Sequence, residues 1–336
     1  MSPHKSILFF LVVLITSNVF CQYTDVINSN RPGVSRSAFS VGTNVAQIEI
    51  GPYMVNEKHT PLKYEVSGYG IDFAARYGLL FEELELNIEG TYQNDTFTDN
   101  RSNIPFDNDR ANFKFLTLGA KYLIYDPYKN SEDEKPNLYS WKANHSFKWK
   151  SLIPAVSVYV GANYDAKNNP YIAPGVEGFS PKVMIATQNN FSGGWVFVLN
   201  LIKDRIGTDQ SDFQYILTLT HSFSPKWVIF GETQGIKSDF YADNLIRFGG
   251  AYLWGKDFQL DTALTFNTKD TPSVMNITLG ASYRLDFHKD KEIDNGNSAE
   301  DEGKRRSNRK GVKKSKNEED SDTVKKRKKK ETDFGN

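Results

Sequence analysis

Residues 276–287 read Asn-Ile-Thr-Leu-Gly-Ala-Ser-Tyr-Arg-Leu-Asp-Phe, a stretch in which apolar and small or polar side chains alternate without a break. In an extended chain, successive side chains point to opposite faces. One face would then carry Ile277, Leu279, Ala281, Tyr283, Leu285 and Phe287, and the other Thr278, Gly280, Ser282, Arg284 and Asp286. The pattern predicts a strand with an apolar face toward lipid and a polar face toward water.

The same alternation recurs along the chain in segments of about ten residues separated by turn residues, which is typical of a membrane barrel. The segments are 44–54, 62–76, 82–94, 111–125, 150–162, 180–190, 194–205, 211–222, 226–236, 244–254, 257–267 and 275–287. Their number is even, as in single-chain bacterial barrels. The sequence therefore predicts an all-β fold, an antiparallel transmembrane β-barrel of about 12 strands within residues 44–288.

Two other classes of fold fit the sequence less well. Beyond residue 21 no stretch approaches the roughly 18 to 20 consecutive apolar residues of a membrane helix, and the mean hydropathy is −0.53. The 17 Tyr, 23 Phe and 24 Gly suit strands and turns. A soluble β-sandwich would also alternate, but it would not ordinarily place charges on one face of every strand.

The connections between the segments predict which end of the barrel faces the periplasm. With both chain ends periplasmic, connections after even-numbered strands should be short turns and those after odd-numbered strands longer external loops. Short turns are expected at 77–81, 191–193, 223–225 and 255–256, and long polar loops at 95–110 and 163–179. The connection 126–149 is long where a turn is expected. Two interpretations of it stay open: an additional periplasmic element, or an error in the strand count.

Tryptophan gives a partly independent indication of sidedness, because amphipathic rings collect where a barrel meets the lipid headgroups. The five tryptophans border the expected inner connections or lie within one: Trp141, Trp149, Trp195, Trp227 and Trp254. Core tryptophans of a soluble protein would show no such sidedness. The pattern therefore favours an aromatic girdle at one end of the barrel.

The first 21 residues predict a cleaved signal peptide. Lys5 precedes a short apolar run over residues 6–16, and cleavage is expected after Cys21. Acylation of Cys21, as in a lipoprotein, is the alternative, and Phe20 argues against it because that site requires a small residue before the cysteine. Loss of the only cysteine leaves no disulfide or thiolate metal site. The expected location is the cell outer membrane, with residues 22–43 as a periplasmic N-terminal segment.

Residues 289–336 form a separate, highly charged region. They contain 16 Lys and Arg and 12 Asp and Glu, a net charge of about +4. Such a segment cannot bury enough apolar surface to fold, so a disordered C-terminal tail is expected. The basic run 325–330 would suggest nucleic acid in a cytosolic protein, but export excludes that partner. An anionic surface or an acidic periplasmic partner is expected for the tail instead.

The polar strand faces place charged residues inside the expected barrel. The candidate lumen-lining residues are Glu49, Arg76, Glu83, Glu85, Glu89, Lys121, Lys203, Glu232, Arg247, Asp261, Arg284 and Asp286. In a barrel of about twelve strands, such groups can set the selectivity of a water-filled passage. The alternative, on about even terms, is that these groups of mixed sign pair with one another and close the lumen.

No catalytic, cofactor-binding or metal-binding residue is predicted. The histidines after residue 21 are His59, His145, His221 and His288. Serine follows two of them, at 146 and 222, but adjacent strand residues point to opposite faces and do not form a nucleophile and base by themselves. The chain contains no Gly-x-Ser-x-Gly, no His-Glu-x-x-His and no glycine-rich phosphate loop. An enzyme is therefore not expected.

Several short motifs occur in a fixed order along the chain. They are Asn30-Arg-Pro-Gly33, Gln47-Ile-Glu-Ile-Gly51, Arg76-Tyr-Gly-Leu79 with Glu85-Leu86, Phe230-Gly-Glu232, Gln259-Leu-Asp261 and Gly280-Ala-Ser-Tyr-Arg284. Together they resemble motifs of the outer-membrane proteins of the MetA-pathway of phenol degradation family, over roughly residues 28–287. Asn30, where the family usually has Asp, and the charged tail depart from its pattern. The resemblance implies an outer-membrane barrel, and the family name implies transport of aromatic compounds.

These observations favour a passive channel or transport-related barrel for small solutes. The alternative is a non-conducting structural or assembly barrel that docks periplasmic partners through its long inner connection and its tail. In either case the expected partners are the lipid of the outer membrane and the machinery that inserts barrels into it.

Overall fold

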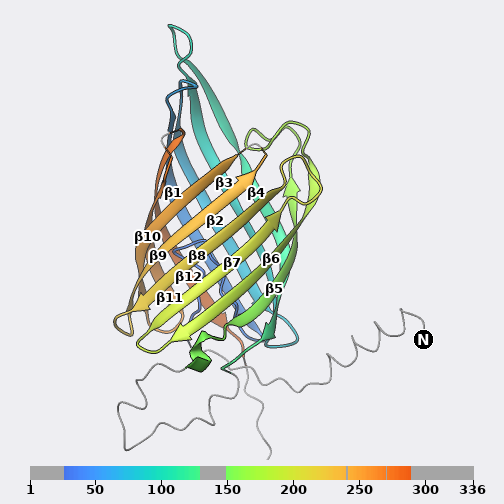
Figure 1. The fold of residues 1–336 in the computed structure, drawn as a ribbon, viewed down its shortest axis with the longest axis vertical. Coiled ribbons are helices and arrows are strands. Elements are labelled where there is room, and N and C mark those ends of the chain that lie inside the picture. Colours follow the sequence, from blue (N-terminus) through green and yellow to red (C-terminus); the bar gives the residue numbers. More distant parts are fainter. Residues whose placement is uncertain (1–25, 129–148, 240, 270, 289–336) are drawn as a thin grey trace, which may run out of the picture. The chain divides into compact units, whose positions relative to one another are not determined.

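A computed structural model of the chain describes residues 26–128, 149–239, 241–269 and 271–288. Within them, twelve antiparallel strands form one closed barrel (Figure 1). The strands are β1 (Val45–His59), β2 (Tyr64–Gly78), β3 (Leu84–Asp99), β4 (Phe106–Tyr125), β5 (Ala155–Asp165), β6 (Gly178–Phe191), β7 (Trp195–Asp204), β8 (Asp212–Ser222), β9 (Trp227–Ser238), β10 (Ala242–Trp254), β11 (Phe258–Asn267) and β12 (Ser273–Asp286). The expected signal peptide and charged tail lie outside the described residues.

Each strand pairs with its neighbours in the sequence, and β1 pairs with β12 to close the ring, with Gln47 opposite Arg284. Closure leaves no edge strand with unpaired backbone groups, a requirement for any sheet that crosses a membrane. Each of the twelve predicted segments overlaps one strand, so the predicted fold class and strand number are confirmed.

Exposure alternates along the strands as predicted. In β1, Gln47 and Glu49 are buried in the interior, whereas Ile48 and Ile50 are 52% and 48% exposed on the outside. This is the reverse of a soluble protein and is typical of a barrel whose outer surface meets lipid. In the part of the chain that the structure describes, no helix is long and apolar enough to span a membrane.

The hairpin of β3 and β4 rises above the other strands (Figure 1). The expected long loop over 95–110 is therefore wrong, because most of it is strand. Thr96 and Thr98 donate hydrogen bonds to Asp109 and Asp107 across the hairpin, at 2.8 and 2.7 Å. Polar residues occupy both faces here, so the sequence lacks the alternation that would have indicated strands.

The two ends of the barrel carry different connections. One end, called the turn end, carries 79–83, 192–194, 223–226 and 255–257; the other, called the loop end, carries 60–63, 100–105, 166–177, 205–211, 239–241 and 268–272. Of the two long loops expected from the sequence, only the one within 163–179 exists, shortened to 166–177. The long connection between β4 and β5 is at the turn end. Residues 129–148 of it lie outside the described part, and it ends in the short 3-10 helix η2 (Trp149–Leu152).

Three tryptophans mark the turn end. Trp195, Trp227 and Trp254 begin or end strands there, and they are 41%, 51% and 68% exposed. The predicted sidedness is confirmed for these three. Trp141 and the side chain of Trp149 lie outside the described residues.

Candidate functional site

The N-terminal segment, residues 26–44, lies inside the barrel. Ile27, Ala38 and Val41 are buried, and hydrogen bonds join the segment to inward side chains of several strands. Residues 22–43 were expected as a periplasmic N-terminal segment. The described part of this segment corrects that expectation, because it lies in the turn-end half of the lumen. Its small polar residues follow no period that could have placed it.

Arg31 of the N-terminal segment is held by the carboxylate of Asp261 in β11. Its Nε and a terminal nitrogen donate to the two oxygens of Asp261 at 3.3 and 3.2 Å, and its carbonyl accepts from Gln259 at 3.0 Å. A Cβ added to Gly51 or Gly280 would collide with the Arg31 guanidinium. The two glycines therefore make room for this side chain between β1 and β12.

Glu232 binds the backbone of the segment directly. The amide N–H groups of Val34 and Ser35 donate to its carboxylate at 3.2 and 3.1 Å. Thr218 and Arg247 also donate to it, at 2.8 and 3.1 Å. A carboxylate that accepts several N–H and O–H groups is well satisfied although it is buried.

A second buried cluster holds the segment from β2, β3 and β4. Arg76 donates to the two oxygens of Glu85 at 3.0 and 2.9 Å, and it also donates to the carbonyl of Asn28 at 2.7 Å. Lys121 donates to the carbonyls of Ser37 and Phe39 at 3.0 and 2.8 Å, with Glu85 at 3.3 Å from its Nζ. The charged groups of this cluster therefore interact both with one another and with backbone carbonyls of the segment.

The remaining predicted lumen residues divide into three groups. Glu49 accepts from the Asn30 amide at 3.2 Å, and Glu89 forms ion pairs with Arg36 of the segment and with Lys182. Arg284 is buried in the lumen. Two others lie at the turn end: Glu83 belongs to the turn 79–83, and Asp286 is exposed at the barrel mouth, where it accepts from Arg284 at 3.1 Å.

Lys203 is the exception, and its predicted lumen position is wrong. It is exposed on the outside of β7, and its register partners Val183 and Phe213 are also exposed outward. The side chains of β7 that face the lumen are instead those in register with Asn200 and Asp204, both of which are buried. Because Lys203 lies near the end of the strand, its long side chain can reach the lipid–water interface.

The loop-end half of the lumen contains a cavity of about 870 Å³. Residues of the N-terminal segment, among them Arg31, Val34 and Arg36, form its floor. Seven Lys or Arg side chains and four Asp or Glu side chains line it: Arg31, Arg36, Lys114, Lys182, Arg205, Arg247 and Lys269, and Glu57, Asp72, Glu89 and Asp204. This volume lies within the roughly 300–1,000 Å³ of small-molecule pockets.

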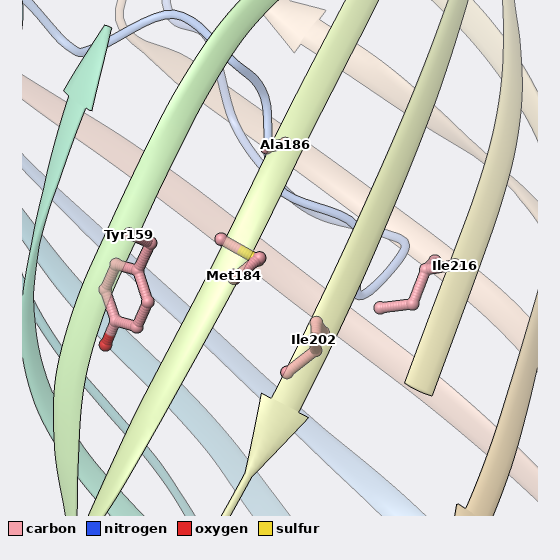
Figure 2. Close-up of a cluster of buried hydrophobic side chains, with 5 residues drawn as sticks. All are labelled: Tyr159, Met184, Ala186, Ile202 and Ile216. Carbon is pink, nitrogen blue, oxygen red and sulfur yellow. The ribbon is translucent and has the colours of Figure 1, made fainter. Parts of the chain in front are cut away.

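One wall of the lumen is apolar. Tyr159, Met184, Ala186, Ile202 and Ile216 form a buried cluster on β5 to β8 (Figure 2). Ile202 and Ile216 of this cluster also line the cavity. The site therefore offers an apolar surface beside charged groups, which suits a solute with both characters.

A β-bulge in β4 adds a cation to the lumen that is not among the residues predicted to line it. Phe115 pairs with Thr91 and Phe113 with Tyr92, so Lys114 is the extra residue, and both Lys114 and Phe115 line the cavity. Strict alternation from Lys121 places Lys114 on the lipid face. A lysine on the lipid face costs about 2–4 kcal/mol at the midplane of the bilayer. This cost was the feature of the sequence that could have indicated a bulge.

The long loop 166–177 is tied to the projecting hairpin by Tyr171. Its hydroxyl oxygen lies 3.1 Å from the carbonyl oxygens of both Gln93 and Arg110, and its single hydrogen can be donated to either. Burial raises the pKa of this phenol, so it stays a donor at any physiological pH. Among the residues described, no group of three or more His, Cys, Asp or Glu is placed to hold a metal ion.

Comparison with known proteins supports an outer-membrane barrel. A family model described as "Putative MetA-pathway of phenol degradation" matches residues 29–285. The COG4313 outer membrane channel from Pseudomonas putida F1 has the same fold, with 10% identity and a TM-score of 0.50 over 77% of this chain and 100% of that one. The KdgM porin matches with 9% identity and a TM-score of 0.44 over 72% and 99%. No curated protein matches the chain.

Proposed function

The chain belongs to the MetA-pathway of phenol degradation family, since the family model covers residues 29–285, and on this premise we propose that it is a passive outer-membrane channel for small solutes. The observation that carries the proposal is the loop-end cavity, whose floor is the N-terminal segment. The hydrogen bonds and ion pairs that hold this segment are reversible. A solute that reaches the cavity is therefore separated from the turn end by a removable barrier.

Planar-bilayer recordings of the purified full chain test this proposal. We expect small conductance steps from the full chain and larger ones from a variant that lacks residues 26–41, because that deletion removes the floor of the cavity. Lys203→Met, on the outer face, is the matched control and should behave as the full chain does. Absence of conductance in both the full chain and the deletion variant would overturn the proposal.

A second candidate function is a non-conducting barrel that docks periplasmic partners through the 126–149 connection and the tail. The filled turn-end half of the lumen favours it. Its test is co-purification from membranes: a partner captured by the full chain and lost on deletion of residues 289–336, together with absent conductance, would select this function.

The orientation and targeting of the chain belong to the same proposal. We place the turn end in the periplasm, with the signal peptide cleaved after Cys21 and the strands inserted by the barrel-insertion machinery into outer-membrane lipid. The tail would then meet an anionic surface or an acidic periplasmic partner. No catalytic role is assigned to any residue.

A further inference from the structure

We infer that the loop-end cavity is a binding site for a small organic anion, with Lys114 as the group that recognises the negative charge. This inference rests on the proposed channel function and names the class of its solute. It depends on three features of the cavity: the way Lys114 reaches it, the absence of a partner for Lys114, and the apolar surface nearby.

The bulge brings Lys114 into the lumen. Without the extra residue, the ladder between β3 and β4 would run on without a break, and the lumen would lose only this side chain. Bulges re-aim side chains and are over-represented next to functional sites. The carbonyl of Lys114 accepts a hydrogen bond from Arg205 at 3.3 Å, which ties the bulge to the loop after β7.

Lys114 differs from the other cations of the cavity in having no partner. Within the described residues, no carboxylate oxygen lies within 4.0 Å of its Nζ. The others each contact an acceptor: Arg31 contacts Asp261, Arg36 contacts Glu89, Lys182 contacts Glu89 and Asp204, Arg205 contacts Asp165, Arg247 contacts Glu232, and Lys269 contacts the Ala242 carbonyl. The Lys114 side chain is exposed at the cavity, so an anionic solute can reach its unpaired charge.

The carboxylates at the cavity do not remove this preference. Glu89 and Asp204 are engaged by Arg36 and Lys182. Asp72 accepts from the Thr91 hydroxyl at 2.5 Å, and Glu57 accepts from a tyrosine hydroxyl at 2.9 Å. These two acids lie at the same cavity and attract the Lys114 charge, but neither comes within ion-pair distance of it.

The apolar surface of the cavity determines the uncharged part of the solute. Phe115 follows it in the chain and lines the cavity, with the Nζ of Lys182 at 5.7 Å from the centre of its ring. Ile202, Ile216 and Val34 line the same space. A solute with one anionic group and a hydrocarbon body of several carbons can contact both kinds of surface.

Isothermal titration calorimetry of the full chain in detergent, near neutral pH, tests the inference with hexanoate as the probe. Hexanamide has the same length without charge, and acetate has the charge without the hydrocarbon. We expect hexanoate to bind at least about tenfold more tightly than either, since a charge-assisted hydrogen bond and apolar burial each contribute at this scale. Equal binding of hexanoate and hexanamide would overturn the inference.

Variants at two lysines assign the effect to the site. Lys114→Met should weaken hexanoate binding by about tenfold or more, and Lys114→Arg should retain it. Lys203→Met, a lysine on the outer face, should leave it unchanged. Unchanged hexanoate binding by Lys114→Met would overturn the inference, because the bulge would then have only a structural role in β4. A chain that conducts but does not bind hexanoate refutes this inference alone, whereas one that binds without conducting refutes the channel function.

Discussion

Arg31 and Asp261 form an ion pair that water barely reaches, with side chains 8% and 0% exposed. Removing one charge of a buried pair costs about 3–5 kcal/mol, because the other charge stays buried without a partner. Arg31 belongs to a segment that is not part of the barrel wall. The protein can therefore avoid most of this cost by releasing the segment while the strands stay paired.

Asp261→Asn should accordingly free the N-terminal segment without unfolding the barrel. Hydrogen–deuterium exchange with mass spectrometry should show faster exchange of the amides in 28–41 and unchanged protection of the strands. Asp209→Asn, in an exposed loop, is the control and should leave the exchange of 28–41 as it is in the unmodified protein. Equal protection of 28–41 in the two variants would mean that Asp261 does not hold the segment.

At the residue scale, the sequence predicted which way most lumen side chains point, but not what they bind. Glu49, Glu232 and Asp261 followed from alternation alone. Their partners could not follow, because the segment that they hold has no period. Lys203 was misplaced because the adjacent Asp204 is also charged, and alternation cannot decide which of two neighbouring charges faces inward.

Among the elements, β12 has one face that is exposed on the outside and one that faces the lumen. Leu279 lies near the middle of the strand and is 61% exposed on the outside, whereas Thr278 lines the cavity. Leu279→Arg should lower the free energy of unfolding by about 2–4 kcal/mol, since the new charge meets the centre of the bilayer. Thr278→Arg should cost far less, because its charge reaches water. Urea unfolding in lipid vesicles measures both, and equal losses would refute the register.

The bulge in β4 makes a prediction of a different kind, in which a residue is deleted. Removal of Lys114 joins two rungs that are already in register and should leave a folded barrel. Removal of Leu118, in a regular part of the same strand, shifts one side of the strand by a residue and turns its inward face toward lipid. Only the first variant should keep the heat-modifiable migration of a folded barrel in gel electrophoresis; folding of both would contradict the assigned bulge.

At the scale of the elements, the existence of all twelve strands could be predicted from the sequence. The ends of a strand could be predicted only where one of its faces is apolar. The extension of β3 over 95–99 and of β4 over 106–110 could not be predicted, because both faces of the hairpin carry polar residues there. A lysine between Phe113 and Phe115 of β4 was visible in the sequence. Its meaning required the register, since a bulge changes which face each later residue occupies.

Over the whole molecule, both ends of the barrel chain meet at the turn end. The amide of Phe287 donates to the carbonyl of Asn44 at 3.1 Å, and an even number of strands makes this arrangement unavoidable. The tail, which follows residue 288, is therefore expected on the same side of the membrane as the start of the barrel.

Protease treatment of cells tests that topology. Trypsin should spare residues 289–336 in intact cells and remove them once the outer membrane is permeabilised, because trypsin cleaves after Lys and Arg, of which these residues contain 16. The barrel itself should resist in both cases. Loss of the tail from intact cells would place the turn end outside the cell and reverse the proposed orientation.

The segment inside the lumen also implies an order of events as the barrel assembles. It precedes every strand in the chain, yet it is held by Glu232 of β9 and Asp261 of β11. These contacts cannot form until most of the wall has been built around it. The residues that emerge before any strand therefore complete these contacts late, and a barrel halted before β9 and β11 join the wall would lack this hold on the segment.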